Sequence, residues 1–181
     1  MQTDPWNVVV TVYQGELKEA MRLLAPFGQV RRTDYWNVLA VEVEDIVDFL
    51  DKLESTLQED ASIANSVSRI IPVTRTFRFS SREEFEQGAR RIVEQWTPEL
   101  EGKTFHVRMH RRGFKGRLSS QHEEQFLDHY LLDDMRLRAS GARIGFEDPD
   151  VIIAVETIGQ IAGLSRWTRE RLDKYELLKL D

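Results

Sequence analysis

The run of five apolar residues at Val151–Val155 restricts the fold of this chain more than any other segment. A strand with one face in water alternates apolar and polar residues, whereas a continuous apolar strand is typical of a sheet covered on both faces. The turn-forming segment Asp148-Pro149-Asp150 comes directly before it, and Ile158–Leu164 is a candidate for the neighbouring strand. These features predict an α/β (α+β) fold in which a sheet is packed against further layers.

The first 79 residues alternate between strand-like and helix-like segments. Strands are predicted from β-branched runs, and helices from apolar residues spaced three and four apart. The predicted elements are a strand at Asn7–Tyr13, a helix at Glu16–Leu24, a strand at Tyr35–Val43, a helix at Asp45–Leu57 and an extended segment at Val67–Phe79, broken by Pro72. This order is compatible with a ferredoxin-like N-terminal domain over residues 1–79.

A second domain is predicted over residues 80–181, because helix signals replace extended structure near residues 79–82. Serine followed by acidic residues marks the start of a helix. The predicted elements are a helix from Ser81 to about Trp96, a strand at Lys103–Met109 and a helix from Ser119 or Ser120 to about Arg138.

Composition excludes several classes of protein. The chain has no cysteine, so it has no disulfide, thiolate zinc site or cysteine nucleophile. No apolar run approaches the roughly 18 residues that span a bilayer, and the start lacks a secretory signal. We therefore expect a cytoplasmic protein without a membrane partner.

Positive charge is concentrated in one segment of a chain whose net charge is −6. The segment Lys103–Arg117 holds six Lys and Arg, two His and no acidic residue. Period-two alternation predicts that His106, Arg108 and His110 share the exposed face of a strand. Two glycines then permit a tight loop, and the next helix presents free amides at its start, so the segment favours a bound phosphate.

This arrangement predicts RNA binding through phosphate contacts. Arginine can bind a phosphate in a bidentate manner, whereas lysine acts as a point charge. The candidate RNA-binding residues are Arg108, His110, Arg111, Arg112, Gly113, Phe114, Lys115, Gly116, Arg117, Ser119 and Ser120. Phe114 either stacks on a terminal base or anchors the loop. The alternative for the whole segment is a solvated basic loop that balances nearby acids.

Other groupings of polar or aromatic residues carry weaker signals. A zinc site would require histidine and carboxylate side chains to meet by folding, and we expect no metal site. Asp148, Asp150 and Glu156 are interpreted as a turn before a buried strand, with Asp150 capping backbone amides, rather than as acid–base catalysts. Four aromatic residues are expected in the core or in a domain interface rather than against bases, namely Trp6, Tyr35, Trp36 and Phe77.

Residues 80–167 resemble a THUMP domain, the RNA-binding module of several tRNA-modifying proteins. The matching features are Phe105–Gly116, Arg143, Asp148-Pro149-Asp150, Val151–Glu156 and Ile161–Ser165. In that family the module lies beside an N-terminal ferredoxin-like domain, and the two together hold the tRNA acceptor arm near its 3′ end. The resemblance is strongest to standalone THUMP proteins similar to the tRNA acetyltransferase adaptor, which present tRNA to a separate enzyme.

The resemblance implies a non-catalytic protein whose partners are tRNA and a tRNA-modifying enzyme. The chain ends about fourteen residues after the resembling part, which leaves no room for an attached catalytic domain. We therefore expect no enzymatic activity, no catalytic residue and no cofactor. The alternatives are a stand-alone RNA-modifying enzyme and a protein-interaction module that binds no RNA.

Overall fold

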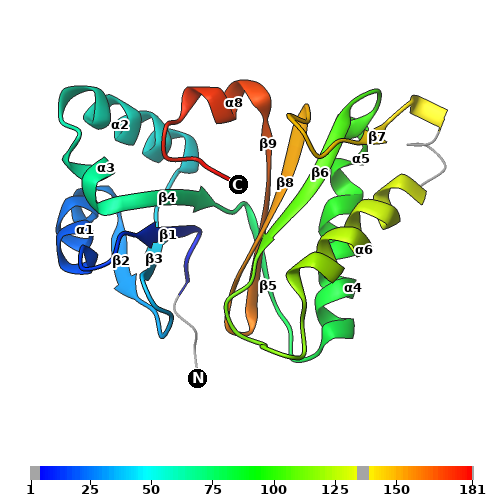
Figure 1. Ribbon diagram of the computed structural model, residues 1–181, viewed down its shortest axis with the longest axis horizontal. Helices are drawn as coiled ribbons and strands as arrows, with labels where there is room; N and C mark the ends of the chain where they lie inside the picture. The colour runs from blue at the N-terminus through cyan, green and yellow to red at the C-terminus, as the bar shows by residue number, and fades with distance from the viewer. Residues whose placement is uncertain (1–4, 134–138, 181) are drawn as a thin grey trace. The chain divides into compact units, whose positions relative to one another are not determined.

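The computed structural model describes residues 5–133 and 139–180, which form two compact units (Figure 1). The first unit comprises the described residues up to Pro72 together with Leu172–Lys179, and the second comprises Val73–Arg171 together with Leu180. The division therefore falls after Pro72 rather than after residue 79, and a segment near the C-terminus belongs to the first unit.

The first unit is built on a four-stranded sheet in the order β2-β3-β1-β4, in which all neighbouring strands are antiparallel. Its strands are β1 Val8–Val12, β2 Gln29–Arg32, β3 Val38–Glu42 and β4 Val67–Pro72. Its helices are α1 Leu17–Leu24, the 3-10 turn η1 Ala25–Phe27, α2 Ile46–Glu59 and α3 Ser62–Ser66.

Helix α2 begins as its sequence predicts. The Asp45 carboxylate accepts a hydrogen bond of 2.7 Å from the Asp48 amide, which satisfies one of the free amides of the first turn. The helix buries four residues of the predicted apolar face: Phe49, Leu50, Leu53 and Leu57. Strand β2 was not expected, because it is short and none of its residues is fully buried. The ferredoxin-like assignment of this unit stays a prediction.

The second unit contains a five-stranded sheet in the order β5-β9-β8-β6-β7. Strand β6 runs parallel to β7 and β8, whereas β9 is antiparallel to β8 and β5. The strands are β5 Arg75–Arg78, β6 Thr104–His110, β7 Arg143–Ile144, β8 Val151–Ile158 and β9 Ile161–Thr168. The helices are α4 Arg82–Val93, the 3-10 turn η2 Glu94–Trp96, α5 Thr97–Leu100 and α6 Ser120–Asp133. Helix α8 Arg169–Lys174 follows β9, and its residues from Leu172 onward belong to the first unit.

Helices α4 and α6 lie side by side on one face of this sheet (Figure 1). They pack Phe85 and Leu127 against Phe105, Val107 and Ile153, all of which are completely buried. Strand β8 is buried from Val151 to Thr157, so the prediction from the apolar run is confirmed. The expected α/β class, with helices covering a sheet, is confirmed as well.

Two predicted elements have different limits in the structure. The extended segment Val67–Phe79 is divided at Pro72 between strands of different sheets, because β5 pairs with β9 rather than with β1. Helix α6 is described as far as Asp133, and its predicted end near Arg138 lies outside the described residues. Within the described part of the chain, no helix is long and apolar enough to cross a membrane.

Gly163 on β9 is a position with no room for an added methyl group. A Cβ there would lie 2.6 Å from Cγ2 and 2.9 Å from Cβ of the buried Val73. Because a β-branched side chain has few alternative rotamers, we predict that Gly163→Ala lowers the free energy of unfolding by about 1–3 kcal/mol in urea denaturation. Adding Val73→Ala should recover part of this loss, and strictly additive losses in the double variant would contradict the explanation.

Candidate functional site

A buried carboxylate holds the end of strand β6 in the second unit. Glu156 on β8 lies opposite His110 in the parallel pairing of the two strands, and its side chain is completely buried. His110 donates a hydrogen bond of 2.6 Å from Nδ1 to Glu156 Oε1, and Arg112 Nη1 donates to Oε2 of the same carboxylate. Two donors thus stabilise a charge that would be costly to bury alone.

The backbone of Arg112 is held as firmly as its side chain. Its amide donates to Thr157 Oγ1 at 2.8 Å, and its carbonyl accepts a hydrogen bond of 2.9 Å from the Gly159 amide. The backbone and the side chain of Arg112 therefore both form hydrogen bonds within the protein. Its predicted role as a phosphate contact stays a prediction, but the geometry assigns it a structural role in positioning the loop.

The loop that follows contains three residues in the left-handed region of backbone space. They are Gly113 with φ of 97°, Phe114 with φ of 53° and Gly116 with φ of 78°. The conformation suits glycine and is uncommon for a residue such as phenylalanine. Phe114 adopts it while its ring packs against Phe79, with a distance of 4.9 Å between the ring centroids. Of the two roles considered for Phe114, this packing is that of an anchor for the loop.

The remaining cations of the segment are more accessible. Arg111 Nη1 donates to the Gly113 carbonyl, and Arg117 lies over the Phe114 ring and donates a hydrogen bond of 3.0 Å to the Ser80 carbonyl. Lys115 is exposed. Arg108 is half-buried on β6.

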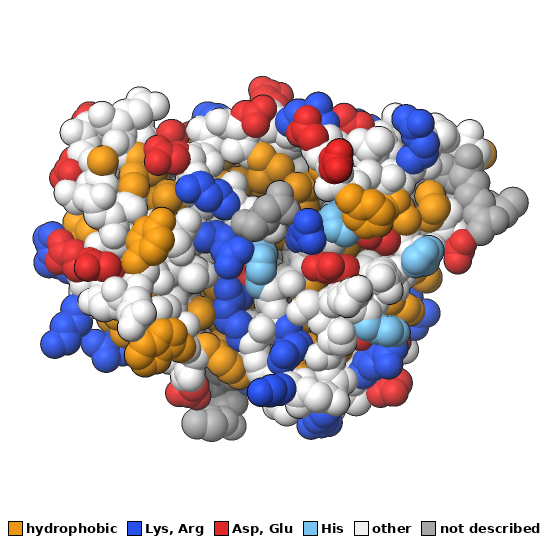
Figure 2. All heavy atoms as spheres, viewed as in Figure 1, with side chains coloured by type: hydrophobic (Ala, Val, Ile, Leu, Met, Phe, Trp, Pro, Cys, Tyr) orange, Lys and Arg blue, Asp and Glu red, His pale blue; other side chains and the backbone are white. Residues whose placement is uncertain are grey.

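A pocket of about 560 Å³ opens at the N-terminus of α6. Ser119 caps this helix, because its Oγ accepts a long hydrogen bond of 3.4 Å from the His122 amide. The polar residues that line the pocket are Arg82, Arg111, Arg117, Ser119, Ser120, Gln121, His122 and one acidic residue, Glu123. Figure 2 shows Lys and Arg side chains gathered over the lower part of the second unit, where Figure 1 draws the chain between β6 and α6. Folding thus brings basic side chains and helix amides to one cavity, which is suited to an anion.

The structure corrects the predicted exposure of His106. Its side chain is buried, and Nδ1 donates a hydrogen bond of 2.8 Å to Asp128 Oδ2 on α6. Asp128 Oδ1 also accepts from the Val107 amide at 2.9 Å, and Glu124 accepts from the Met109 amide at 2.8 Å. Two carboxylates four residues apart on α6 therefore satisfy amides along β6 beyond its short pairing with β7. The spacing of the two carboxylates can be read from the sequence, but the strand whose amides they bind cannot.

The turn before β8 agrees with its sequence interpretation. Asp150 accepts hydrogen bonds from the Thr104 amide at 2.9 Å and from the Thr104 hydroxyl at 3.0 Å, and these bonds lower the pKa of the Asp150 carboxyl. The capping role predicted for Asp150 is confirmed. Glu156 is bound instead to His110 and Arg112.

The exposed aromatic residue Trp36 differs from its expectation. Trp6 is buried as predicted, whereas Trp36 is 80% exposed between β2 and β3 of the first unit. It directly precedes Asn37, whose φ of 57° marks a turn. The core half of the prediction for Trp36 is therefore wrong, whereas its placement in a domain interface stays a prediction.

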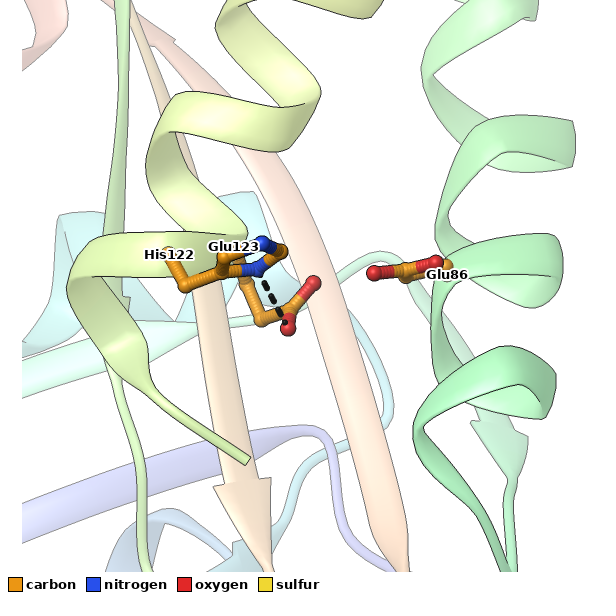
Figure 3. A group of neighbouring side chains, drawn as sticks. All are labelled: Glu86, His122 and Glu123. Atoms are coloured by element: carbon orange, nitrogen blue, oxygen red, sulfur yellow. Dashed lines mark hydrogen bonds and ion pairs between the residues drawn. The ribbon is translucent and has the colours of Figure 1, made fainter. Parts of the chain in front are cut away.

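Three side chains at the start of α4 and α6 form a group that the sequence did not reveal (Figure 3). Glu86, His122 and Glu123 each offer a ligand atom, and these atoms lie within 4.8 Å of one another. Burial raises the pKa of the Glu123 carboxyl above its usual range, while a hydrogen bond from His122 opposes the rise. These are the described residues best placed to hold a metal ion.

Comparison with known proteins identifies the fold. No family model matches the chain, and no curated protein matches it. TrmN from Thermus thermophilus is 20% identical with a TM-score of 0.57 over 91% of this chain and 46% of its own. PH1313 from Pyrococcus horikoshii Ot3 is 15% identical with a TM-score of 0.56 over 90% of this chain and 55% of its own.

A third solved structure is a 4-thiouridine synthetase in complex with RNA and with bound ATP. It is 16% identical with a TM-score of 0.54, over 91% of this chain and 42% of its own. The chain thus spans about half the length of the solved structures that it matches. These likenesses confirm the THUMP-like α/β fold that the sequence resemblance implied.

The Glu156 contacts predict a specific effect on stability. Replacing Glu156 by Gln removes the charge that balances Arg112 in a buried site, so the free energy of unfolding should fall by about 3 kcal/mol. Chemical denaturation of the two proteins measures the difference. Glu147→Gln is the control, since Glu147 is exposed and its replacement should change the stability by less than about 0.5 kcal/mol. Equal unfolding midpoints for Glu156→Gln and the unaltered protein would show that the pair contributes nothing.

Proposed function

We propose that this protein binds structured RNA, namely the acceptor end of tRNA, and presents it to a separate modifying enzyme without catalysing a reaction itself. The observation that carries the proposal is the pocket at the N-terminus of α6. Basic side chains from the loop and the free amides of a helix meet there around a cavity of about 560 Å³. This combination suits a phosphate group in its charge and in its hydrogen-bond donors.

The basic residues of the segment divide by accessibility. His110 and Arg112 are bound to Glu156, whereas Lys115 and Arg117 are exposed on the loop. The exposed pair, together with Arg111, is the part of the segment that can reach a phosphate without breaking a buried contact. We therefore assign phosphate contact to the exposed cations and loop positioning to the buried ones.

The fold supports RNA as the ligand. The 4-thiouridine synthetase that shares this fold was solved in complex with RNA. The choice of tRNA, the ferredoxin-like character of the first unit and the adaptor role rest on the resemblance of residues 80–167 to standalone THUMP proteins. A catalytic role would instead require that the purified protein alters an RNA base.

Removing the exposed cations should weaken tRNA binding. We predict that Lys115→Ala with Arg117→Ala lowers the affinity at least about tenfold, because each charged hydrogen bond contributes on the order of 1.5 kcal/mol. The slope of log affinity against log salt should also fall by about 2, one unit for each phosphate that the variant no longer neutralises. Fluorescence anisotropy with labelled tRNA over a series of KCl concentrations measures both quantities.

The matched control removes one Arg and one Lys elsewhere in the second unit. Arg91 lies near the end of α4, and Lys103 lies before the start of β6, at the opposite end of the basic segment from the loop. Both are exposed. Arg91→Ala with Lys103→Ala should leave the affinity and the salt slope nearly unchanged. An equal loss in the control, or no loss in the loop variant, would reject the loop as the binding surface.

The adaptor role predicts a specific result in cells. Crosslinking followed by sequencing of the bound RNA should recover tRNA acceptor ends, and a tRNA-modifying enzyme should be copurified. The purified protein incubated with tRNA should leave every base unchanged in mass spectrometry. A modified base made by the protein alone would support the enzyme alternative, and recovery of a protein partner without RNA would support the interaction module.

A further inference from the structure

The group Glu86, His122 and Glu123 lies at the facing sides of α4 and α6. Glu86 extends from α4 toward α6, and the Glu123 carboxylate lies between the two helices beside the His122 ring (Figure 3). One ligand atom from each residue lies within 4.8 Å of the others. His122 and Glu123 also line the pocket at the α6 N-terminus. The group therefore borders a cavity that solvent can enter.

Glu123 is the residue that makes this group unusual. Its side chain is completely buried, yet Oε2 has no hydrogen-bond partner. A buried carboxylate oxygen without a donor or a cation is costly, and most such atoms in proteins are satisfied. The other oxygen, Oε1, accepts a hydrogen bond of 3.1 Å from His122 Nδ1. Glu123 thus directs an unsatisfied oxygen toward Glu86, although its side chain has no exposed surface (Figure 3).

Arg82 supplies the positive charge beside these residues. Its Nε lies 2.9 Å from Glu86 Oε1 and 3.2 Å from Glu123 Oε1, and its Nη2 lies 2.6 Å from His122 Nε2, so Arg82 contacts all three residues. One guanidinium group thus faces two carboxyl groups. The Arg82 side chain is 43% exposed, and its long, flexible stem allows it to turn toward solvent.

We propose that Glu86, His122 and Glu123 form a binding site for a divalent transition metal ion, with Zn²⁺ as the representative ion. Imidazole nitrogen and carboxylate oxygen are ligands that Zn²⁺ accepts in tetrahedral sites, and cysteine is not required. The ion satisfies Glu123 Oε2 and balances both carboxylates when Arg82 moves aside. Three protein ligands leave one coordination position for water or another oxygen ligand.

Calorimetric titration of the metal-free protein, residues 1–181, with ZnCl₂ tests the proposal. The unaltered protein should bind one Zn²⁺ per chain. His122→Ala and Glu86→Gln should each weaken binding by more than about tenfold, because loss even of an outer supporting group has an effect of that size. Arg82→Ala should bind Zn²⁺ at least as tightly as the unaltered protein, since it removes the competing cation.

The matched control is His129→Ala, which removes an exposed histidine from the same helix but outside the group. Its affinity for Zn²⁺ should equal that of the unaltered protein. Circular dichroism of each variant verifies folding, and because Glu86 and His122 are less buried than Glu123, the test does not depend on a Glu123 variant. Absence of Zn²⁺ binding, binding that survives both ligand variants, or loss of binding in Arg82→Ala would each overturn the proposal. None of these results depends on RNA binding, which is measured separately.

Discussion

The conformation of the basic loop depends on the buried carboxylate of Glu156. A charge with no exposed surface requires close partners, and β8 meets that requirement through His110 at the end of β6 and Arg112 two residues later. Once Arg112 is held there, the chain turns through glycine positions and its aromatic anchor reaches Phe79. The loop therefore brings Arg111 and Arg117 to the pocket at the start of α6. Its basic residues form two groups, one that builds the site and one that faces the solvent.

Local sequence patterns correctly predicted those helices and strands whose buried residues form an apolar run or an apolar face within the element itself. The apolar run at Val151–Val155 became the central strand β8, and the apolar face of α2 packs as its spacing indicates. The sequence predicted a break at Pro72 within the extended segment Val67–Phe79, but it did not predict that the two strands would pair in different sheets. Strand β2 was missed since its short sequence contains no buried residue. In each case the structure of the segment depends on pairing with a strand elsewhere in the sequence.

The candidate site, too, could be predicted from the sequence only in part. Charge clustering located the loop, but it treats all six cations of Lys103–Arg117 alike. Their separate environments depend on Glu156, more than forty positions later in the chain. The alternation rule placed His106 correctly on the face that it shares with Arg108, yet Asp128 on α6 buries it. Likewise, nothing near His122 in the sequence indicated that Glu86 would lie beside it, because only the packing of α4 against α6 brings them together.

The pocket at the N-terminus of α6 unites these features, since the loop cations Arg111 and Arg117, the capping residue Ser119 and the carboxylate of Glu123 all line it. Hydrogen exchange of the backbone amides, with and without saturating tRNA, tests directly whether this pocket receives the RNA. The first-turn amides of Ser120 and Gln121 should exchange more slowly with tRNA present, because they lack partners within the helix and a bound phosphate accepts from them. Unchanged exchange across residues 111–123, with slower exchange elsewhere in the chain, would contradict the assignment of the RNA site to this loop.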